Sequence, residues 1–358
     1  MPFDPRTKKL ARLVVDYSLA VKHDENVVIS GSTEASEFIA ELYKAVILRG
    51  AHPILRVSLP ELSPFFYKYA RDHQIKKFPD HFDYTVKNAQ KYIGIDTVSN
   101  TRDLADADPR KIVAREIITR PITNYIVNRR EKIWRCTVGF PCMAMAQEAE
   151  MSLADYERFV FGACLQDWQK VGKFIDKILA KFRKGTISHL VGEGVDLKFQ
   201  INGKLAKADK GEENMPGGEV YMAPLRTILE GKILFDYPAI ESGKEVSDIY
   251  LEFKKGKVVK FAASKNKNFL REMLATDKNS SYVGEFGIGC NPKINRFTKN
   301  LLFDEKINGT IHLALGMAYK DNGGGNNSAI HWDIVKNMKR GKIILDGKVV
   351  QEKGKWKM

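Results

Sequence analysis

The pattern of secondary structure expected from the sequence changes near Gly185, and this change constrains the fold more than any other feature. Before it, short apolar runs alternate with amphipathic helical patterns; after it, the runs are short, alternate in polarity and are joined by Gly and Asn turns. The first pattern is typical of a doubly wound parallel sheet, and the second of an antiparallel barrel or sandwich. We therefore predict an α/β domain with a mainly parallel sheet over residues 1–185, and a β-rich, barrel-like domain over residues 186–358.

Several elements of both halves are specific enough to be placed. Strands are predicted at Asn26–Ser30, Pro53–Val57, Tyr92–Asp96 and Ile133–Val138, and helices at Glu34–Arg49, Arg110–Arg120, Ser264–Ala275 and in two blocks between Ser152 and Lys184. Hairpins are predicted about Lys255-Gly256 and Asp346-Gly347, because such pairs favour tight turns. The first strand-to-helix turn, Ser30–Glu34, lacks the glycine patterns that hold a diphosphate, so we expect the first half to be a scaffold.

The net charge of +14 first directs attention to polyanionic partners. The excess divides equally at Gly185, however, whereas nucleic-acid binders concentrate charge on one face or arm. We expect a lysine-rich solvated surface and no nucleic-acid partner. No apolar run approaches the ~18 residues of a membrane span, and basic residues interrupt the first 22 positions where a signal peptide needs an apolar stretch. We therefore expect no membrane association and a cytoplasmic location.

Two histidines of the second half lie in strand-like apolar runs. His312 lies in Thr310–Gly316, and His331 is followed two residues later by Asp333. Because strand side chains alternate, His331 and Asp333 project from the same face and offer a nitrogen and an oxygen to the same point. A surface or core histidine is the more common explanation of each residue taken alone.

Three acidic residues in the same half change that weighting. Glu219 and Glu285 follow glycines in strand-like runs, and Glu305 ends an apolar run. A carboxylate among apolar neighbours is costly unless it is paired or bound to a metal. Together with the histidines and Asp333, these acids favour a metal site.

The composition of this residue set indicates the chemistry. None of the four cysteines forms a C-x-x-C pair, so we expect reduced, buried thiols and a site without thiolate. Oxygen and imidazole ligands suit Zn²⁺, Co²⁺ or Mn²⁺. Four carboxylates and two imidazoles exceed the needs of one tetrahedral ion and suit two divalent ions about 3.5–4 Å apart, which activate a water for attack on a carbonyl.

Ordered motifs along the chain resemble the aminopeptidase T family, the thermophilic-type leucyl aminopeptidases. The motifs are WRCTVGFP at Trp134–Pro141, NMPGGEVYMAP at Asn214–Pro224, GEFGIG at Gly284–Gly289, LFDE at Leu302–Glu305, TIHLALGMAY at Thr310–Tyr319 and SAIHWD at Ser328–Asp333. The resemblance covers nearly the whole chain. It implies a two-metal exopeptidase that removes N-terminal residues from short peptides with broad, leucine-like preference, and a homodimer whose sites face an internal cavity.

The resemblance also assigns roles to individual residues. It implies the metal ligands Glu219, Glu285, His312, His331 and Asp333. Glu305 matches the family's LFDE acid, although more residues separate it from His312 than the family pattern has. Tyr319 matches a tyrosine at the metal centre, where it ligates a metal or stabilises the oxyanion; a packed aromatic is the alternative. Glu219 and Glu285 are both candidates for the general base.

Two other functions remain open from the sequence. A metallohydrolase of another class, such as an amidase or phosphoesterase, would use the same ligands, although no arginine cluster for a phosphate accompanies the motifs. A basic nucleic-acid-binding protein is the weaker alternative. The run Gly323–Gly325 either forms a mobile lid or a plain surface turn.

Overall fold

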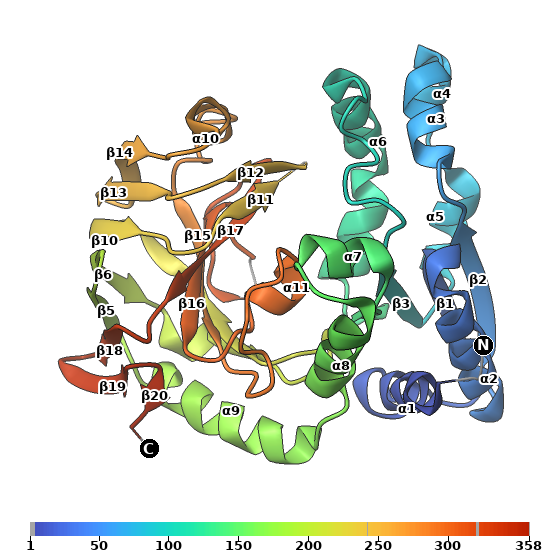
Figure 1. The fold of residues 1–358 in the computed structure, drawn as a ribbon, viewed down its shortest axis with the longest axis horizontal. Helices are drawn as coiled ribbons and strands as arrows, with labels where there is room; N and C mark the ends of the chain where they lie inside the picture. The colour runs from blue at the N-terminus through green and yellow to red at the C-terminus, as the bar shows by residue number, and fades with distance from the viewer. Residues whose placement is uncertain (1–3, 242, 320–321, 358) are drawn as a thin grey trace. The chain divides into compact units, whose positions relative to one another are not determined.

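The structure is a computed structural model that describes residues 4–241, 243–319 and 322–357 (Figure 1). By internal contacts the chain divides into two compact units. Unit 1 comprises Met1–Leu165 and Gly211–Pro216, and unit 2 comprises Gln166–Lys210 and Gly217–Met358. The predicted division at Gly185 into a scaffold and a catalytic domain remains a prediction.

Unit 1 is built on a five-stranded sheet in the order β2-β1-β3-β4-β8, in which every pairing is parallel (Figure 1). Its strands are β1 (Asn26–Ser32), β2 (His52–Ser58), β3 (Lys91–Asp96), β4 (Trp134–Gly139) and β8 (Asn214–Met215). Its helices are α1 (Pro5–Leu13), continued by a π-helical turn at Val14–Ser18, α2 (Ser36–Leu48), α3 (Leu62–Tyr69), α4 (Asp72–Ile75), α5 (Asp80–Lys87), α6 (Pro109–Asn128), α7 (Met143–Glu148) and α8 (Leu153–Cys164). The parallel α/β fold predicted for the first half is confirmed.

Apolar side chains on both faces of β1 explain the layers of unit 1. Val28 packs with Val86 of α5 and Ile122 of α6. Val27 and Ile29 leave the opposite face and are also fully buried, and α2 contacts β1 and β2. Strands buried on both faces read as continuous apolar runs, which is the signal in the sequence.

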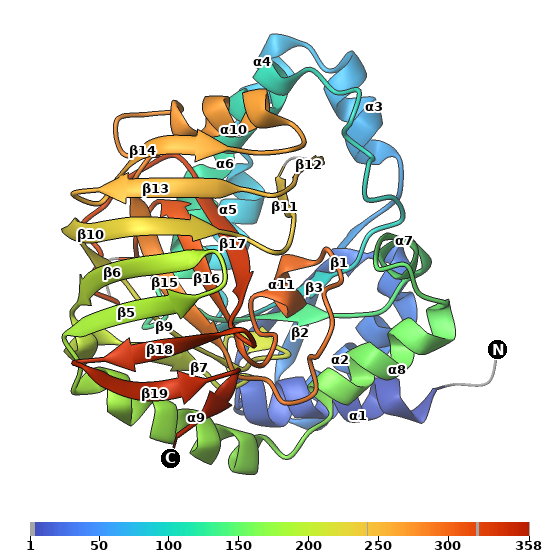
Figure 2. The same ribbon diagram turned by 60° about the vertical axis from the view of Figure 1, so that its left-hand side comes forward.

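Unit 2 contains an eight-stranded sheet and a five-stranded sheet (Figure 2). The larger has the order β14-β13-β10-β6-β5-β18-β19-β20 and the smaller β17-β16-β15-β9-β7. The strands are β5 (Ile187–Gly192), β6 (Val195–Ile201), β7 (Lys207–Asp209), β9 (Glu219–Met222), β10 (Pro224–Leu234), β13 (Tyr250–Lys254), β14 (Lys257–Ala262), β15 (Val283–Gly289), β16 (Thr310–Gly316), β17 (His331–Asn337), β18 (Gly341–Leu345), β19 (Lys348–Glu352) and β20 (Lys355–Trp356). A separate hairpin joins β11 (Ala239–Glu241) to β12 (Lys244–Val246), and the helices are α9 (Trp168–Arg183), α10 (Lys267–Leu274) and α11 (Leu301–Asp304).

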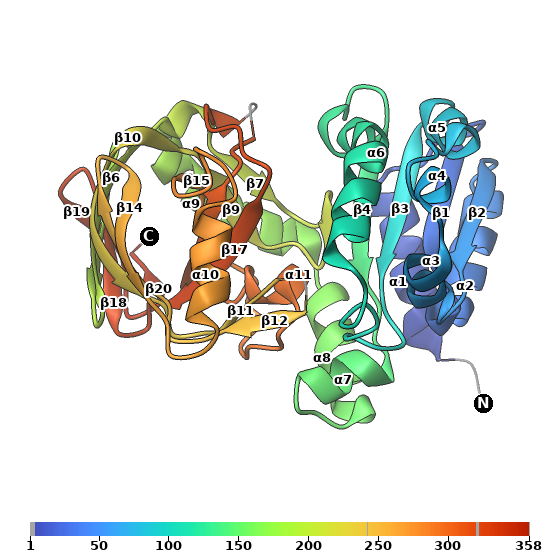
Figure 3. The same cartoon turned by 90° about the horizontal axis from the view of Figure 1, so that it is seen from above.

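The two sheets share one hydrophobic core, to which α9 also contributes (Figure 3). Phe199 of the larger sheet and Phe286 of the smaller one make an edge-to-face contact with ring centroids 4.9 Å apart. The barrel-like expectation needs one correction. Within the described residues β14 and β20 are the two edge strands of the larger sheet and do not pair with each other, so the strands form two open sheets and no closed barrel.

Both predicted hairpins of unit 2 are confirmed. β13 and β14 are joined by Lys255 and Gly256, and β18 and β19 by Asp346 and Gly347, all with positive φ. Positive φ at both central residues is the type I′ geometry that matches the twist of the flanking strands. All four cysteines are free and buried, as expected. No helix in the described part of the chain is long and apolar enough to cross a membrane.

Candidate metal centre

The smaller sheet of unit 2 brings the acidic and histidine side chains together. Glu219 opens β9, Glu285 lies in β15, His312 in β16, and His331 with Asp333 in β17. The register places Ala314 of β16 between Glu285 and Asp333 on its two neighbours. Glu219 and Asp333, which are 114 positions apart in the sequence, therefore share one region of the sheet.

His312 lies at the centre of the cluster. Its Nε2 is 3.6 Å from an oxygen of Glu285, 3.8 Å from Glu219 and 3.9 Å from Asp333. The other ring nitrogen, Nδ1, is 3.2 Å from the backbone oxygen of Glu305. A histidine held through Nδ1 presents Nε2 in a fixed direction, as in many metal-binding histidines.

His331 borders the cluster beside Asp333. Its Nε2 is 3.4 Å from Asp333, and its Nδ1 is 2.8 Å from the backbone oxygen of Met317. The His331 side chain is 20% exposed, whereas that of His312 is 1% exposed. The cluster is therefore closed around His312 and more accessible at His331.

The close approach of His312 explains the glycine at position 287, two residues after Glu285. A Cβ at position 287 would lie 2.0 Å from Nε2 of His312, its partner across the β15–β16 pair. Only glycine leaves space for the imidazole there. We expect Gly287→Ala to displace His312 and to lower kcat/KM for peptide hydrolysis by about 10- to 100-fold, the range for lost support of a metal ligand.

The matched control for this substitution is Gly162→Ala, because a Cβ at Gly162 meets nothing within 4 Å. Steady-state hydrolysis and bound metal should be compared in both variants. Full activity of Gly287→Ala would contradict the assigned packing of His312.

Burial and charge shift the pKa values of the cluster in opposite directions. Burial raises the pKa of Glu219 to about 8. For Asp333 burial acts upward, but His331 and then His312 outweigh it and lower the pKa to about 2. Burial would lower the pKa of both histidines, but the neighbouring carboxylates raise it to about 9 for His312 and about 10 for His331. The raised pKa values of both histidines mean that the neighbouring carboxylates favour positive charge at the two rings.

The donors fit divalent metal ions. Ligand atoms of Glu219, Glu305 and His312 lie within 4.8 Å of one another, and so do those of Glu285, His312 and Asp333. Nε2 of His312 and Oδ1 of Asp333 are buried without a hydrogen-bond partner in the described part of the chain. Buried polar atoms of this kind need an explanation, and a missing ion is a standard one. Oxygen and imidazole donors without thiolate suit zinc, cobalt or manganese.

Lys306 belongs to this site and was missed in the sequence. Its side chain is fully buried and forms ion pairs with Glu305 and, at 3.6 Å, with Glu219. Burial lowers the pKa of Lys306, but Glu219, Glu305 and Asp209 outweigh it and hold that pKa above its usual range. In the sequence Lys306 is recognisable only as a lysine between Glu305 and an isoleucine. A lysine in that position is equally compatible with an exposed surface residue.

Tyr319 and the glycine run that follows it lie beside the cluster. The rings of Tyr319 and His331 are 5.2 Å apart by their centroids. Asn322 is fully buried and donates a hydrogen bond of 3.1 Å to Glu285. A Cβ at Gly324 would lie 2.2 Å from the Cβ of Ala318. The described part of this loop, from Asn322 onward, is therefore packed against the site, and Asn322 is a second residue that the sequence did not reveal.

Asp277 anchors the end of the same loop. Its carboxylate accepts hydrogen bonds from Ser328 Oγ at 2.8 Å and from the Ala329 N–H at 2.7 Å, just before His331. Partial burial acts to raise the pKa of Asp277, but hydrogen bonds from Ala329, Asn279 and Ser328 lower it. A lowered native pKa means stability that is present above the unfolded pKa and lost as the pH falls through the native one.

We expect Asp277→Asn to lower the free energy of unfolding by about 1 kcal/mol at neutral pH, the usual size for such hydrogen bonds. The difference from the wild type should be constant above about pH 5 and shrink below about pH 4. Urea unfolding at both pH values measures it, with the exposed Asp106→Asn as control. A difference that grows on acidification would contradict the assigned direction of the pKa.

Comparison with known proteins identifies the family of the chain. The sequence profile of the family described as thermophilic metalloprotease (M29) matches residues 3–356. Aminopeptidase AmpS of Bacillus subtilis (strain 168) is 24% identical, over 93% of this chain and 89% of that protein. Aminopeptidase T of Thermus thermophilus is 33% identical over 40% of this chain and 41% of that protein.

Solved structures show the same fold. The structure of wild-type AmpT from Thermus thermophilus has a TM-score of 0.87 at 22% identity and covers 99% of this chain and 100% of that one. A 2,5-dihydroxypyridine dioxygenase from Pseudomonas putida KT2440 has a TM-score of 0.59 at 13% identity and covers 98% of this chain and 96% of that one. The chain belongs to the M29 family of thermophilic-type metalloproteases and is a metallo-aminopeptidase.

Proposed function

We propose that the chain removes N-terminal residues, with broad leucine-like preference, from short peptides at a centre of two divalent ions. The observation that carries this proposal is the pair of overlapping donor groups, one with Glu219 and Glu305 and the other with Glu285 and Asp333, which meet at His312. One ion cannot use all these donors, whereas two adjacent ions can share bridging carboxylates.

In this proposal the ligands are Glu219, Glu285, Glu305, His312, His331 and Asp333. Zinc, cobalt or manganese ions held by these residues would supply Lewis acidity and would lower the pKa of a water at the site. Asn322 fixes the orientation of Glu285 through its 3.1 Å hydrogen bond. Backbone oxygens of Glu305 and Met317 fix the two imidazoles. Such supporting contacts determine where each ligand atom points.

The remaining roles concern proton transfer and charge. Glu219 or Glu285 accepts the proton of the attacking water as general base. The hydroxyl of Tyr319, whose ring lies beside His331, donates a hydrogen bond to the oxyanion of the tetrahedral intermediate. We further propose a homodimer, on the strength of the sequence resemblance.

Hydrolysis assays with three chromogenic substrates test the proposed activity. Leucyl-p-nitroanilide should be cleaved after addition of Co²⁺, Zn²⁺ or Mn²⁺, while N-acetyl-leucyl-p-nitroanilide, which lacks the free amino group, should not be cleaved. Bis-p-nitrophenyl phosphate reports on the phosphoesterase alternative. Release from the phosphodiester with none from the leucyl substrate would overturn the proposal. Sedimentation of the full chain tests the dimer.

A further inference from the structure

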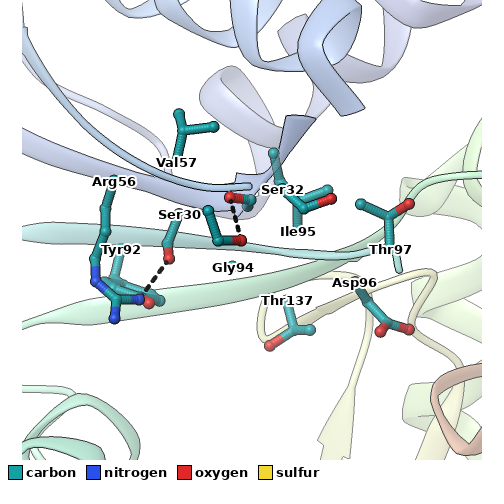
Figure 4. A pocket seen from close by; sticks show the side chains of 12 residues that line it. Ser30, Ser32, Arg56, Val57, Tyr92, Gly94, Ile95, Asp96, Thr97 and Thr137 are labelled. Carbon is teal, nitrogen blue, oxygen red and sulfur yellow. Dashed lines mark hydrogen bonds between the residues drawn. The ribbon is translucent and has the colours of Figure 1, made fainter. Parts of the chain in front are cut away.

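Unit 1 contains a cavity of about 470 Å³ at the carboxyl ends of its central strands (Figure 4). In the strand order β2-β1-β3, strand β2 follows β1 in the chain and lies on one side of it, whereas β3 lies on the other side of β1. The direction in which strands are added to the sheet therefore reverses between β1 and β3. Ligands of open α/β sheets bind at such switch points, outside the carboxyl ends of the strands. The volume lies in the usual range of small-molecule sites.

One row of residues across the sheet forms the floor of this cavity. Ser30 of β1 pairs with Arg56 of β2 and with Gly94 of β3, and Gly94 pairs with Thr137 of β4. The side chains of Arg56, Ser30 and Thr137 leave the sheet on the same side (Figure 4). Where a helix covers a face of the sheet, that face carries apolar residues. Val28, two residues before Ser30 and on the same face of β1, is an example. This row carries hydroxyls, a guanidinium and a glycine.

The polar groups of the row are held as hydrogen-bond donors. Arg56 donates to Ser30 Oγ at 3.4 Å, and Arg135 donates to Thr137 Oγ1 at 3.3 Å. Because each hydroxyl oxygen already accepts a hydrogen bond, its own hydrogen remains for an acceptor. The guanidinium of Arg56 is also fixed over the ring of Phe82, 4.2 Å from its centroid.

The charges of the arginines and of Asp96 at this cavity indicate which class of ligand it would bind. In the described part of the chain neither Arg56 nor Arg135 has a carboxylate within 4.0 Å, in contrast to Arg6, Arg102 and Arg130 of the same unit. Arginine with adjacent hydroxyl donors recognises carboxylates and phosphates. Asp96 lines the same cavity, and its negative charge favours a monoanion over a phosphate dianion.

We propose that this cavity binds a small organic carboxylate, such as a free α-amino acid, through Arg56 and the hydroxyls of Ser30 and Thr137. The site lies wholly in unit 1 and is formed by none of the residues of the candidate metal centre. Its existence does not depend on the proposed hydrolysis. The proposal goes beyond the expectation that the first half is a scaffold.

The glycine of the row provides a blocking substitution. A Cβ at Gly94 would meet Tyr92 Cε1 at 3.5 Å and Thr137 Oγ1 at 3.9 Å, which are ordinary contacts, and Gly94 has no positive φ. Valine is therefore compatible with the backbone and would fill the floor of the cavity. Arg56→Met removes the guanidinium, and Arg110→Met removes an equal charge from a side chain that is 91% exposed and outside the cavity.

The test is a titration of the full chain, dialysed against EDTA, followed by backbone amide chemical shifts of Ser30, Gly94 and Thr97. The probes are L-leucine, 4-methylpentanoate, the neutral 4-methylpentanamide and inorganic phosphate. Both carboxylates should shift these amides saturably and the neutral amide should not. Arg56→Met and Gly94→Val should weaken binding by about tenfold or more, the size of a lost charged hydrogen bond, and Arg110→Met should leave it unchanged.

Each opposite result overturns the proposal. These are no saturable shift with either carboxylate, equal binding of the neutral amide, or binding that Arg56→Met leaves intact. Phosphate binding about tenfold tighter than that of the carboxylates would assign the cavity to another ligand class. Arg56→Met leaves every residue of the candidate metal centre unchanged, so loss of the shifts in this variant separates binding in the cavity from leucine bound at the metal centre.

Discussion

His312→Ala is expected to lower kcat/KM for leucyl-p-nitroanilide by about a thousandfold or more and to reduce the metal bound per chain. The imidazole Nε2 is the point at which the two donor groups meet, within 4 Å of Glu219, Glu285 and Asp333. Its removal affects both ion positions at once, so the loss should exceed the ~10- to 100-fold effect of disturbing a supporting contact. Steady-state kinetics with added Co²⁺ or Zn²⁺, together with elemental analysis, measures both effects.

His189 offers a matched control for this substitution. It lies in β5 of the same unit, one-third exposed, and its Nε2 is 2.7 Å from Asp196. His189→Ala should retain metal and activity within about twofold, as for other surface substitutions. A His312→Ala variant that keeps wild-type activity would contradict the central role of His312, provided that its circular dichroism matches the wild type.

Lys306→Met is expected to lower the free energy of unfolding of the metal-free chain by about 3–5 kcal/mol. The ammonium group is fully buried between Glu305 and Glu219, and removal of one partner from a buried ion pair leaves an uncompensated charge. Divalent ions supply positive charge to the same carboxylates. The deficit should therefore shrink when Zn²⁺ or Co²⁺ is added at saturating concentration, because binding to the native state alone adds stability.

Lys336→Met distinguishes this effect from the loss of any buried lysine. The Lys336 side chain is 3% exposed and pairs at 3.0 Å with Asp236, whose own side chain is 41% exposed and lies outside the donor groups. Its substitution should cost stability that metal does not restore. Denaturant unfolding of both variants with EDTA and with metal gives the comparison. A Lys306→Met deficit that is the same in both conditions would contradict a metal site at Glu219 and Glu305.

Local patterns were sufficient for the strands and hairpins that the sequence predicts. The expected strands at Asn26–Ser30 and Tyr92–Asp96 are β1 and β3 within two residues of each end, because runs buried on both faces are apolar throughout. Asp346-Gly347 formed the expected turn because both residues tolerate positive φ. In these elements the backbone conformation is determined by neighbours in the sequence.

Non-local pairings were not predictable in the same way. β8 has only two residues, Asn214 and Met215, yet it pairs with Thr137 and Val138 and returns the chain to unit 1. So short a strand carries no periodicity of its own. The open sheets of unit 2 were also not predictable. Closure of a barrel depends on whether the first and last strands pair, and this pairing does not change the sequence pattern of either strand.

The candidate site shows the same division. The acids and histidines were recognisable because charged groups within apolar strands are unusual. Lys306 and Asn322 were not, since their importance arises from contacts with Glu219, Glu305 and Glu285 across the fold. Gly287 was visible only as a glycine near an acid, and its reason, the ring of His312 against its Cα, requires the β15–β16 register.

Titration of the metal-free chain with Zn²⁺ or Co²⁺, followed by leucyl-p-nitroanilide hydrolysis and elemental analysis, tests the dinuclear centre most directly. The two donor groups around His312 predict that EDTA dialysis abolishes activity and that activity reaches its plateau only at two ions per chain. Full activity at well under two ions per chain, or hydrolysis by the metal-free chain, would contradict the account.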